Sequence, residues 1–145
     1  MLVKAVDIQP TEHEPGLYAL KLVDGARGAR DVALLRGWLA PGARHSLHTH
    51  EVEEVVVFLS GSGIVSMNGQ QFDIGPGDAI LVPAGIPHST WNPSPEETLH
   101  FVAAFSGSVV ASTPTGDAAV LPPGRLRRRA VWNRVRWFLQ RLRRR

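Results

Sequence analysis

The pattern of apolar and polar positions predicts a chain built from many short strands. Runs rich in Val, Leu, Ile and aromatic residues alternate with clusters of Gly, Pro, Asn and Asp. The Asn68-Gly69 pair between two of these runs is a strong signal for a two-residue hairpin. The predicted strands cover residues 2–8, 17–23, 32–41, 44–50, 55–60, 63–67, 70–74, 79–82, 87–92 and 98–105. Many short strands with such turns indicate an all-β barrel or sandwich.

Two of these segments carry histidines in a pattern that suggests chemistry. His48 and His50 are two residues apart, so in a strand their side chains lie side by side on one face. On a straight strand Glu54 would lie about 13 Å beyond His50. The chain must therefore turn near residues 49–53 if Glu54 is to face the same ion. His88 must come from a separate strand, and three imidazoles with a carboxylate suit a divalent transition metal.

The two segments resemble the two signature motifs of the cupin superfamily. The first family pattern is a glycine, five residues, His-x-His, three or four residues, a glutamate, six residues and a glycine. This chain keeps every spacing of it with Gly42, His48, His50, Glu54 and Gly61. The second is a glycine, five residues, Pro-x-Gly, two residues, a histidine, three residues and an asparagine. This chain keeps it with Gly77, Pro83, Gly85, His88 and Asn92.

The resemblance covers about residues 32–106 and implies a fold and a ligand set. The fold is a small double-stranded β-barrel of the cupin or jelly-roll type, expected over residues 1–106 with its core motifs in 42–92. The metal ligands it implies are His48, His50, Glu54 and His88. It also implies that the protein is a homodimer, because small cupins commonly pair through their edge strands.

Length and composition agree with one compact domain of 145 residues. The chain has no cysteine, which excludes disulfides and thiolate metal ligands. Its beginning has no apolar core of a signal peptide, and no apolar run approaches the length of a membrane span. We expect a cytoplasmic protein.

The charge is divided unevenly along the chain. Residues 125–145 contain ten arginines and no acidic group, whereas residues 1–124 contain six basic and thirteen acidic groups. Residues 107–124 are rich in Ser, Thr, Pro and Gly and are predicted to be a linker. The net charge of +3 therefore conceals an acidic barrel and a basic C-terminal tail.

The tail has the apolar periodicity of a helix. Val131, Val135, Phe138 and Leu142 recur on one face, which predicts a basic amphipathic helix over residues 125–145. Such a helix packs on its own barrel, docks on an acidic protein surface, or lies on an anionic membrane surface as a peripheral anchor. Binding of nucleic acid through phosphates is a further alternative.

The reaction depends on which ion the site holds. Iron, manganese, nickel or copper would support a dioxygenase-type oxidoreductase acting on a small oxygenated organic substrate that chelates the metal. Zinc would leave Lewis-acid chemistry, as in an isomerase, cyclase or lyase. A third hypothesis is a non-catalytic ligand-binding or sensor cupin that uses its tail for interaction.

Other side chains are candidates for supporting roles. Glu54 is the candidate acid or base if it is displaced from the metal, as are His100 and Tyr18 if they face the cavity. His45 has the opposite strand parity to His48 and is expected at the surface or rim. The candidate pocket walls are Trp38, Phe58, Met67, Val82, Trp91 and Phe101.

Overall fold

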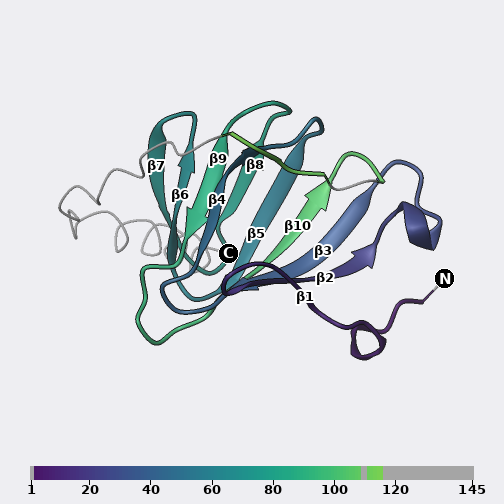
Figure 1. Ribbon diagram of the computed structural model, residues 1–145, viewed down its shortest axis with the longest axis horizontal. Coiled ribbons are helices and arrows are strands. Elements are labelled where there is room, and N and C mark those ends of the chain that lie inside the picture. The colour runs from purple at the N-terminus through teal and green to yellow at the C-terminus, as the bar shows by residue number, and fades with distance from the viewer. Residues whose placement is uncertain (1, 109–110, 116–145) are drawn as a thin grey trace, which may run out of the picture.

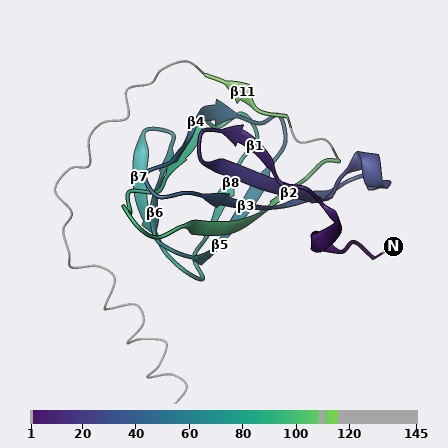
Figure 2. The ribbon, with the colours of Figure 1, turned by 60° about the horizontal axis from the view of Figure 1, so that its bottom comes forward.

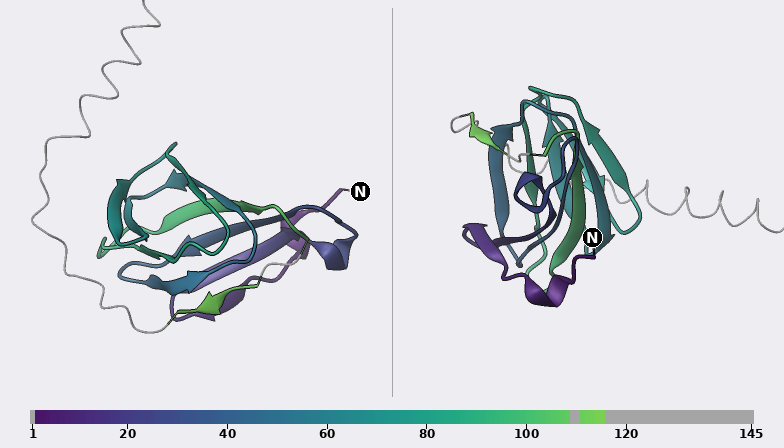
Figure 3. Two further views of the ribbon diagram at one scale, coloured as in Figure 1. Left: turned by 90° about the horizontal axis from the view of Figure 1, so that it is seen from above. Right: turned by 90° about the vertical axis from the view of Figure 1, so that its right-hand side faces the viewer.

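A computed structural model describes residues 2–108 and 111–115 as two facing antiparallel β-sheets (Figure 1; Figure 3 shows the two layers from above and from the side). The six-stranded sheet has, in spatial order, β1 (Thr11–Glu14), β2 (Leu17–Val23), β3 (Ala33–Leu39), β10 (Leu99–Phe105), β5 (Glu54–Ser60) and β8 (Ala79–Val82). The five-stranded sheet has β11 (Thr113–Pro114), β4 (Arg44–Thr49), β9 (His88–Trp91), β6 (Gly63–Met67) and β7 (Gln70–Ile74). This architecture confirms the predicted all-β double-stranded barrel.

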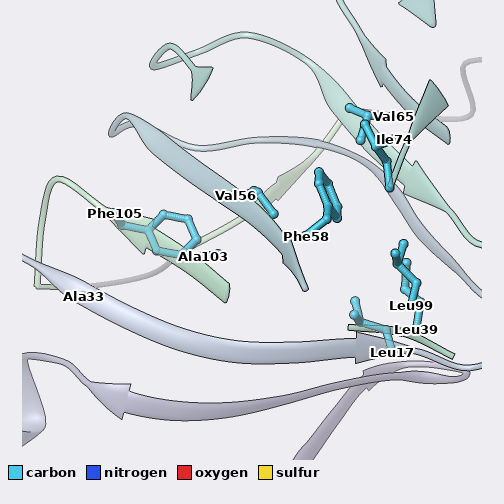
Figure 4. Close-up of a cluster of buried hydrophobic side chains, with 10 residues drawn as sticks. All are labelled: Leu17, Ala33, Leu39, Val56, Phe58, Val65, Ile74, Leu99, Ala103 and Phe105. Atoms are coloured by element: carbon cyan, nitrogen blue, oxygen red, sulfur yellow. The ribbon is translucent and has the colours of Figure 1, made fainter. Parts of the chain in front are cut away.

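The core lies between the two sheets (Figure 4). Strand β5 shows how the period of two builds it, because Val56 and Phe58 are buried while the alternate residues Val55 and Val57 are exposed. On the neighbouring strands, Leu39 and Leu99 are fully buried against the same cluster. The inward-facing rows of the two sheets therefore make one continuous hydrophobic core.

The N-terminal segment differs from its prediction. Residues 2–8 were expected to form a strand, which is wrong: the structure has a short 3-10 helix, η1 (Ala5–Asp7), and Leu2 and Val6 are 82% and 86% exposed. Apolar residues alone do not make a strand, because a strand also needs a partner for its backbone groups. The edge strand β1 was missed because its sequence, Thr-Glu-His-Glu, is entirely polar.

The chain after the last core strand also contributes to the sheet. Within the stretch predicted as a linker, β11 pairs with β4, and Thr113 and Pro114 lie opposite Thr49 and His48 (Figure 2).

The predicted tail helix at 125–145 lies outside the described residues. No helix within the described ranges is long and apolar enough to span a bilayer. A second short 3-10 helix, η2 (Gly25–Arg27), joins β2 to β3.

Asn92, the last residue of the second motif, has a structural role. It is fully buried, and its Nδ2 donates to the carbonyl oxygens of Leu39, Ala40 and Glu97 at 3.0, 3.1 and 2.7 Å. Its Oδ1 accepts from the backbone N–H of Ser94 at 3.1 Å. This one amide thus ties the end of β3 to the loop that follows β9 and satisfies backbone groups that the barrel buries.

Candidate metal centre

The three predicted histidines meet in the interior of the barrel. His48 lies in β4, His50 directly follows this strand, and His88 begins β9, with His48 and His88 opposite each other in the ladder. Their ring nitrogens lie within 4.8 Å of one another, and all three residues are buried. Three buried imidazole nitrogens this close together could hold one metal ion.

The turn before β9 aims His88 at the other two histidines. The backbone N–H of Gly85 donates to the carbonyl oxygen of His50 at 2.7 Å, which fastens this turn to the end of β4. Gly85 has a φ of +75°, a left-handed conformation that a side chain disfavours. The motif glycine thus allows the chain to reverse close to the site.

Glu54 comes from the opposite sheet and completes the cluster. Its Oε2 lies 3.0 Å from Nε2 of His88 and 3.6 Å from Nε2 of His50. The chain bends between β4 and β5, as the distance argument requires. Glu51 and Glu53 are exposed whereas Glu54 is buried, so the structure distinguishes the three neighbouring carboxylates.

Backbone carbonyls fix the tautomer of every histidine in the cluster. The Nδ1 atoms of His48 and His88 lie 2.7 and 3.0 Å from the carbonyl oxygens of Ser46 and Ile86. The Nδ1 of His50 lies 2.7 Å from the carbonyl oxygen of Ala111. A carbonyl only accepts, so each Nδ1 carries the proton and donates. In the neutral rings each Nε2 therefore presents a lone pair to the centre of the cluster.

These lone pairs repel one another unless a cation lies between them. The Nε2 atoms of His48 and His50 are 3.1 Å apart, and neither carries a proton to share in the neutral rings. Nε2 of His88 faces a carboxylate oxygen of Glu54 in the same way. Three imidazole nitrogens and one carboxylate are a donor set for a divalent transition metal. The residues present thus fit the ion that the sequence predicted.

Burial keeps two histidines at this centre, His45 and His48, neutral. Burial lowers the pKa of His48 to about 3, with a further lowering by His45 and His88 and an opposing rise from the hydrogen bond to Ser46. Burial, followed by the nearby His88 and His50, lowers the pKa of His45 to about 4. Neutral imidazole is the form that binds a metal, so His48 is ready to do so at neutral pH.

His45 lies against the cluster, contrary to its strand parity. The ladder between β4 and β9 advances from His45 to His48 on one strand but only from Thr90 to His88 on the other. This β-bulge inserts one residue and turns His45 to the side of His48. The two rings stack with their centroids 3.8 Å apart, and His45 Nε2 lies 3.6 Å from Oε1 of Glu14. The parity argument is wrong here because it assumed a regular strand.

Comparison with known proteins identifies the family. A model of the cupin domain matches residues 38–105, the stretch that contains all four candidate ligands. The chain belongs to the cupin superfamily. The position of the match agrees with the resemblance that the two motifs carry.

The relatives of this cupin have varied names. Auxin-binding protein T85 of Nicotiana tabacum is 29% identical over 89 residues, which are 54% of this chain and 48% of that protein. The chain spans about half the length of the curated relatives it matches.

Two solved structures cover more of the chain. The polyketide cyclase RemF from Streptomyces resistomycificus has a TM-score of 0.68 and 26% identity, with 80% of this chain and 85% of RemF covered. A predicted oxalate decarboxylase from Thermotoga maritima has a TM-score of 0.65 and 25% identity, with 74% and 99% covered.

Four of the candidate pocket residues of this cupin lie inside the barrel. Met67 lies opposite His88 in the ladder between β6 and β9, and Val82 lies opposite Glu54 between β5 and β8. Phe58 belongs to the hydrophobic core, and Phe101 packs against it. Met67 and Val82 are thus the two that the register places beside candidate metal ligands.

The remaining candidates lie away from the cluster. His100 and Trp38 are opposite each other on β10 and β3, on the faces turned away from the core, and Trp38 stacks on Tyr18 with ring centroids 5.6 Å apart. Nδ1 of His100 is buried and has no hydrogen-bond partner among the described residues. Trp91 lies under the guanidinium of Arg44, at 4.3 Å. The structure therefore does not bring His100, Trp38, Tyr18 or Trp91 to the histidines.

Some residues around the centre had no signal in the sequence. The Ser46 and Ile86 carbonyls lie two residues before the histidines they orient, so the strands themselves supply them. Ala111 is 61 residues from His50, and Phe105 packs edge-on against the His50 ring at 5.1 Å between centroids. Both depend on tertiary contacts that no local pattern reveals.

Proposed function

We propose that this cupin is a metal-dependent enzyme acting on a small, oxygen-rich organic anion that chelates the ion. The observation that carries the proposal is that four lone-pair donors converge: Nε2 of His48, His50 and His88, and Oε2 of Glu54. Neighbouring donor atoms in this group are 3.0 to 3.6 Å apart. Four protein ligands close a tetrahedral site, but on a transition metal with five or six ligands they leave one or two positions for substrate or water. A carboxylate or enolate with two oxygen donors suits such an open position.

The residues of the site have separable tasks. A divalent ion bound there supplies Lewis acidity to an oxygen of the substrate. The three histidines hold the ion with rings that the backbone carbonyls orient. Glu54 is the one donor that is also able to take a proton from a bound substrate, at Oε2, when it is displaced from the ion. The neighbouring Val82 and Met67 would exclude water from the reacting atoms.

We infer a non-oxidative reaction, a cyclisation or a decarboxylation, as the first candidate chemistry. The names of two structural neighbours, a polyketide cyclase and a predicted oxalate decarboxylase, support this class. Both names refer to substrates rich in oxygen donors. Such a substrate would suit an ion held by three histidines and a glutamate.

Dioxygenase-type oxidation of a chelating substrate is the second candidate. The same three-histidine and glutamate donor set favours it if the resident ion is iron, manganese, nickel or copper, because its open positions then accept dioxygen as well as substrate. An isomerase belongs with the first class, since it also needs only Lewis acidity and proton transfer.

The first experiment is elemental analysis of protein purified without chelators. Wild type is expected to contain about one equivalent of a transition metal. The His48→Ala/His50→Ala double variant is expected to lose it, while His13→Ala, which removes an exposed histidine of β1, retains it. Wild-type protein without metal, even after reconstitution, would overturn the proposal.

The second experiment separates the reaction classes. Metal-loaded wild type and Glu54→Gln are incubated with small dicarboxylates and β-dicarbonyl compounds while carbon dioxide release and dioxygen uptake are followed. Carbon dioxide release or ring closure without dioxygen uptake supports the first class, and dioxygen uptake supports the second. Tight binding of these compounds to metal-loaded protein with no turnover would instead support the sensor hypothesis, in which the barrel only binds a ligand.

A further inference from the structure

One carboxylate outside the cluster reaches from one sheet of the barrel to the other. Glu14 ends β1, the edge strand of the six-stranded sheet, and β4 lies next to β11 at the edge of the five-stranded sheet (Figure 2). Both carboxylate oxygens of Glu14 accept from the backbone N–H of Ser46, at 3.0 and 3.1 Å. Oε2 also accepts from the Ser46 hydroxyl. One side chain of β1 thus holds both donors of a residue in β4.

Ser46 lies in the β-bulge of β4, where the sheet gives it no opposite residue. The ladder with β9 passes from His45 to His48, and the two-residue strand β11 pairs with His48 and Thr49. In the described part of the chain, Ser46 is therefore without a partner in register. A bulge leaves its extra residue unpaired and lets the strand bend there. The hydrogen bonds to Glu14 supply the constraint that a strand partner would otherwise provide.

The position of Ser46 matters because its carbonyl oxygen accepts from Nδ1 of His48 at 2.7 Å. This bond orients the ring so that Nε2 points to the centre, 3.1 Å from Nε2 of His50. A rotation of the Ser46 peptide would move the acceptor and let the His48 ring turn. Ile86 and Ala111, whose carbonyls orient the other two histidines, belong to other segments. His48 is thus the candidate ligand whose orientation depends on the bulge.

Glu14 also lies beside the ring that packs on His48. Its Oε1 is 3.6 Å from Nε2 of His45, and the rings of His45 and His48 stack with their centroids 3.8 Å apart. A carboxylate favours the tautomer of a neighbouring imidazole that carries the proton on the nearer nitrogen. The stacked His45 ring also occupies space into which the His48 ring would otherwise turn. The contacts of Glu14 with Ser46 and with His45 therefore act on the same ring.

We propose that Glu14 is a positioning residue for His48, which it holds through Ser46 and His45 with Nε2 directed at the ion. The inference rests on the proposed function for its metal, whereas the orientation of the ring can be measured without one. A group that orients a metal ligand directly typically changes the affinity about 10- to 100-fold. Glu14 acts through one further residue, so its effect on affinity is expected to be smaller.

The test follows the Nδ1–H protons of the three histidines in metal-free protein by heteronuclear NMR. Glu14→Ala removes the acceptor of both Ser46 donors. Solvent exchange of the His48 Nδ1–H is expected to become at least about fivefold faster, because its own acceptor is no longer held in place. The Nδ1–H protons of His50 and His88 are the internal references and should stay within about twofold of wild type.

Glu12→Ala is the matched control on the same strand. The Glu12 carboxylate also accepts a backbone N–H, that of Gly16 at 2.9 Å, but this bond lies within its own hairpin. It should leave all three exchange rates unchanged. Glu14→Gln keeps an oxygen for the Ser46 N–H and an amide for the Ser46 hydroxyl, so it is expected to restore slow exchange. If Glu14→Ala folds poorly, Ser46→Ala removes the hydroxyl contact alone and should speed exchange of His48 at least about twofold.

Titration with Co²⁺ measures the consequence for the metal centre. Glu14→Ala is expected to lose roughly three- to tenfold in affinity, and Glu12→Ala is expected to bind as wild type does. Unchanged exchange of His48 in Glu14→Ala would overturn the proposal, as would equal acceleration of all three histidines. Faster exchange of His48 with unchanged Co²⁺ affinity would also overturn it, because the orientation would then not serve the metal. A wild type that binds no Co²⁺ would overturn the proposed function, while the exchange rates in metal-free protein would still decide whether Glu14 orients His48.

Discussion

The Nδ1–H of His50 donates a hydrogen bond to the carbonyl oxygen of Ala111 at 2.7 Å, across 61 residues of sequence. The other two histidines are oriented by carbonyls only two residues before them. Ala111 precedes β11, and the pairing of β11 with β4 holds this carbonyl in place. The orientation of one candidate ligand therefore depends on a segment that follows the last core strand.

Loosening this segment is expected to weaken metal binding. The backbone N–H of Thr115 donates to the carbonyl oxygen of Leu47 at 3.2 Å, and Thr115→Pro removes this donor. Loss of a group that orients a metal ligand typically costs about 10- to 100-fold in affinity, which competition with a chromophoric chelator would measure. Thr115→Ala keeps the N–H and is expected to bind as wild type does. Equal affinities in the two variants would contradict the role of β11.

Glu54 is expected to contribute to metal affinity, unlike its neighbours. Glu54→Gln keeps the size of the side chain but replaces a charged donor near His88 with a neutral amide. We expect metal affinity to fall at least about tenfold in titrations with Co²⁺. Glu53→Gln, one residue away and exposed, is the matched control and should leave the affinity unchanged. A Glu54→Gln variant with wild-type affinity would remove this carboxylate from the ligand set.

The metal-free protein is expected to lose stability as the pH falls below about 6.5. The pKa of His48 is lowered to about 3 and that of His45 to about 4, from 6.5 in a solvated histidine. The unfolded chain therefore binds more protons in this range, and stability falls with decreasing pH. At pH 5 the loss is on the order of 2 kcal/mol for each of the two histidines.

Urea unfolding between pH 4 and pH 8, with chelator present, measures this loss. His45→Gln is expected to flatten the pH dependence of the unfolding free energy by about one proton, because one of the two shifted groups is gone. An unchanged slope in His45→Gln would show that the half-buried His45 ring does not resist protonation.

Asn92 is expected to matter for stability more than for metal binding. Asn92→Asp removes the donors to three carbonyl oxygens and places a carboxylate oxygen against them. We expect a loss of about 3 kcal/mol or more in the free energy of unfolding. Ser94→Ala, in the same loop, removes only the exposed side-chain acceptor for the N–H groups of Glu96 and Glu97 and should cost about 1 kcal/mol. Similar losses in both variants would contradict the role assigned to the Asn92 amide.

The residues that were predictable from sequence are those governed by local rules. The spacing of His48, His50 and His88, together with the glycines and prolines around them, predicted the three-histidine cluster that the structure shows. Most strands were predictable because a period of two and turn residues act over a few positions. The prediction of a strand over residues 2–8 was wrong, and β1 was not predicted. In both places the presence of a strand depends on pairing with a neighbouring strand, which the local pattern does not reveal.

The positions that depend on sheet register were beyond the sequence. His100 was ambiguous because apolar residues occupy both faces of β10, so alternation gave no sign of which face is buried. His45 changed sides through a bulge that only the pairing of β4 with β9 reveals.

The sequence by itself determined the all-β class through its periodicity and, through the spacing of the two motifs that resemble those of cupins, the barrel and the three histidines that cluster. Only the tertiary structure decided the tautomers of the rings, the contact of Ala111 with His50 and the contact of Glu14 with Ser46. These features arise where distant segments meet, and the free energy of such contacts depends on register and burial that a linear pattern does not contain.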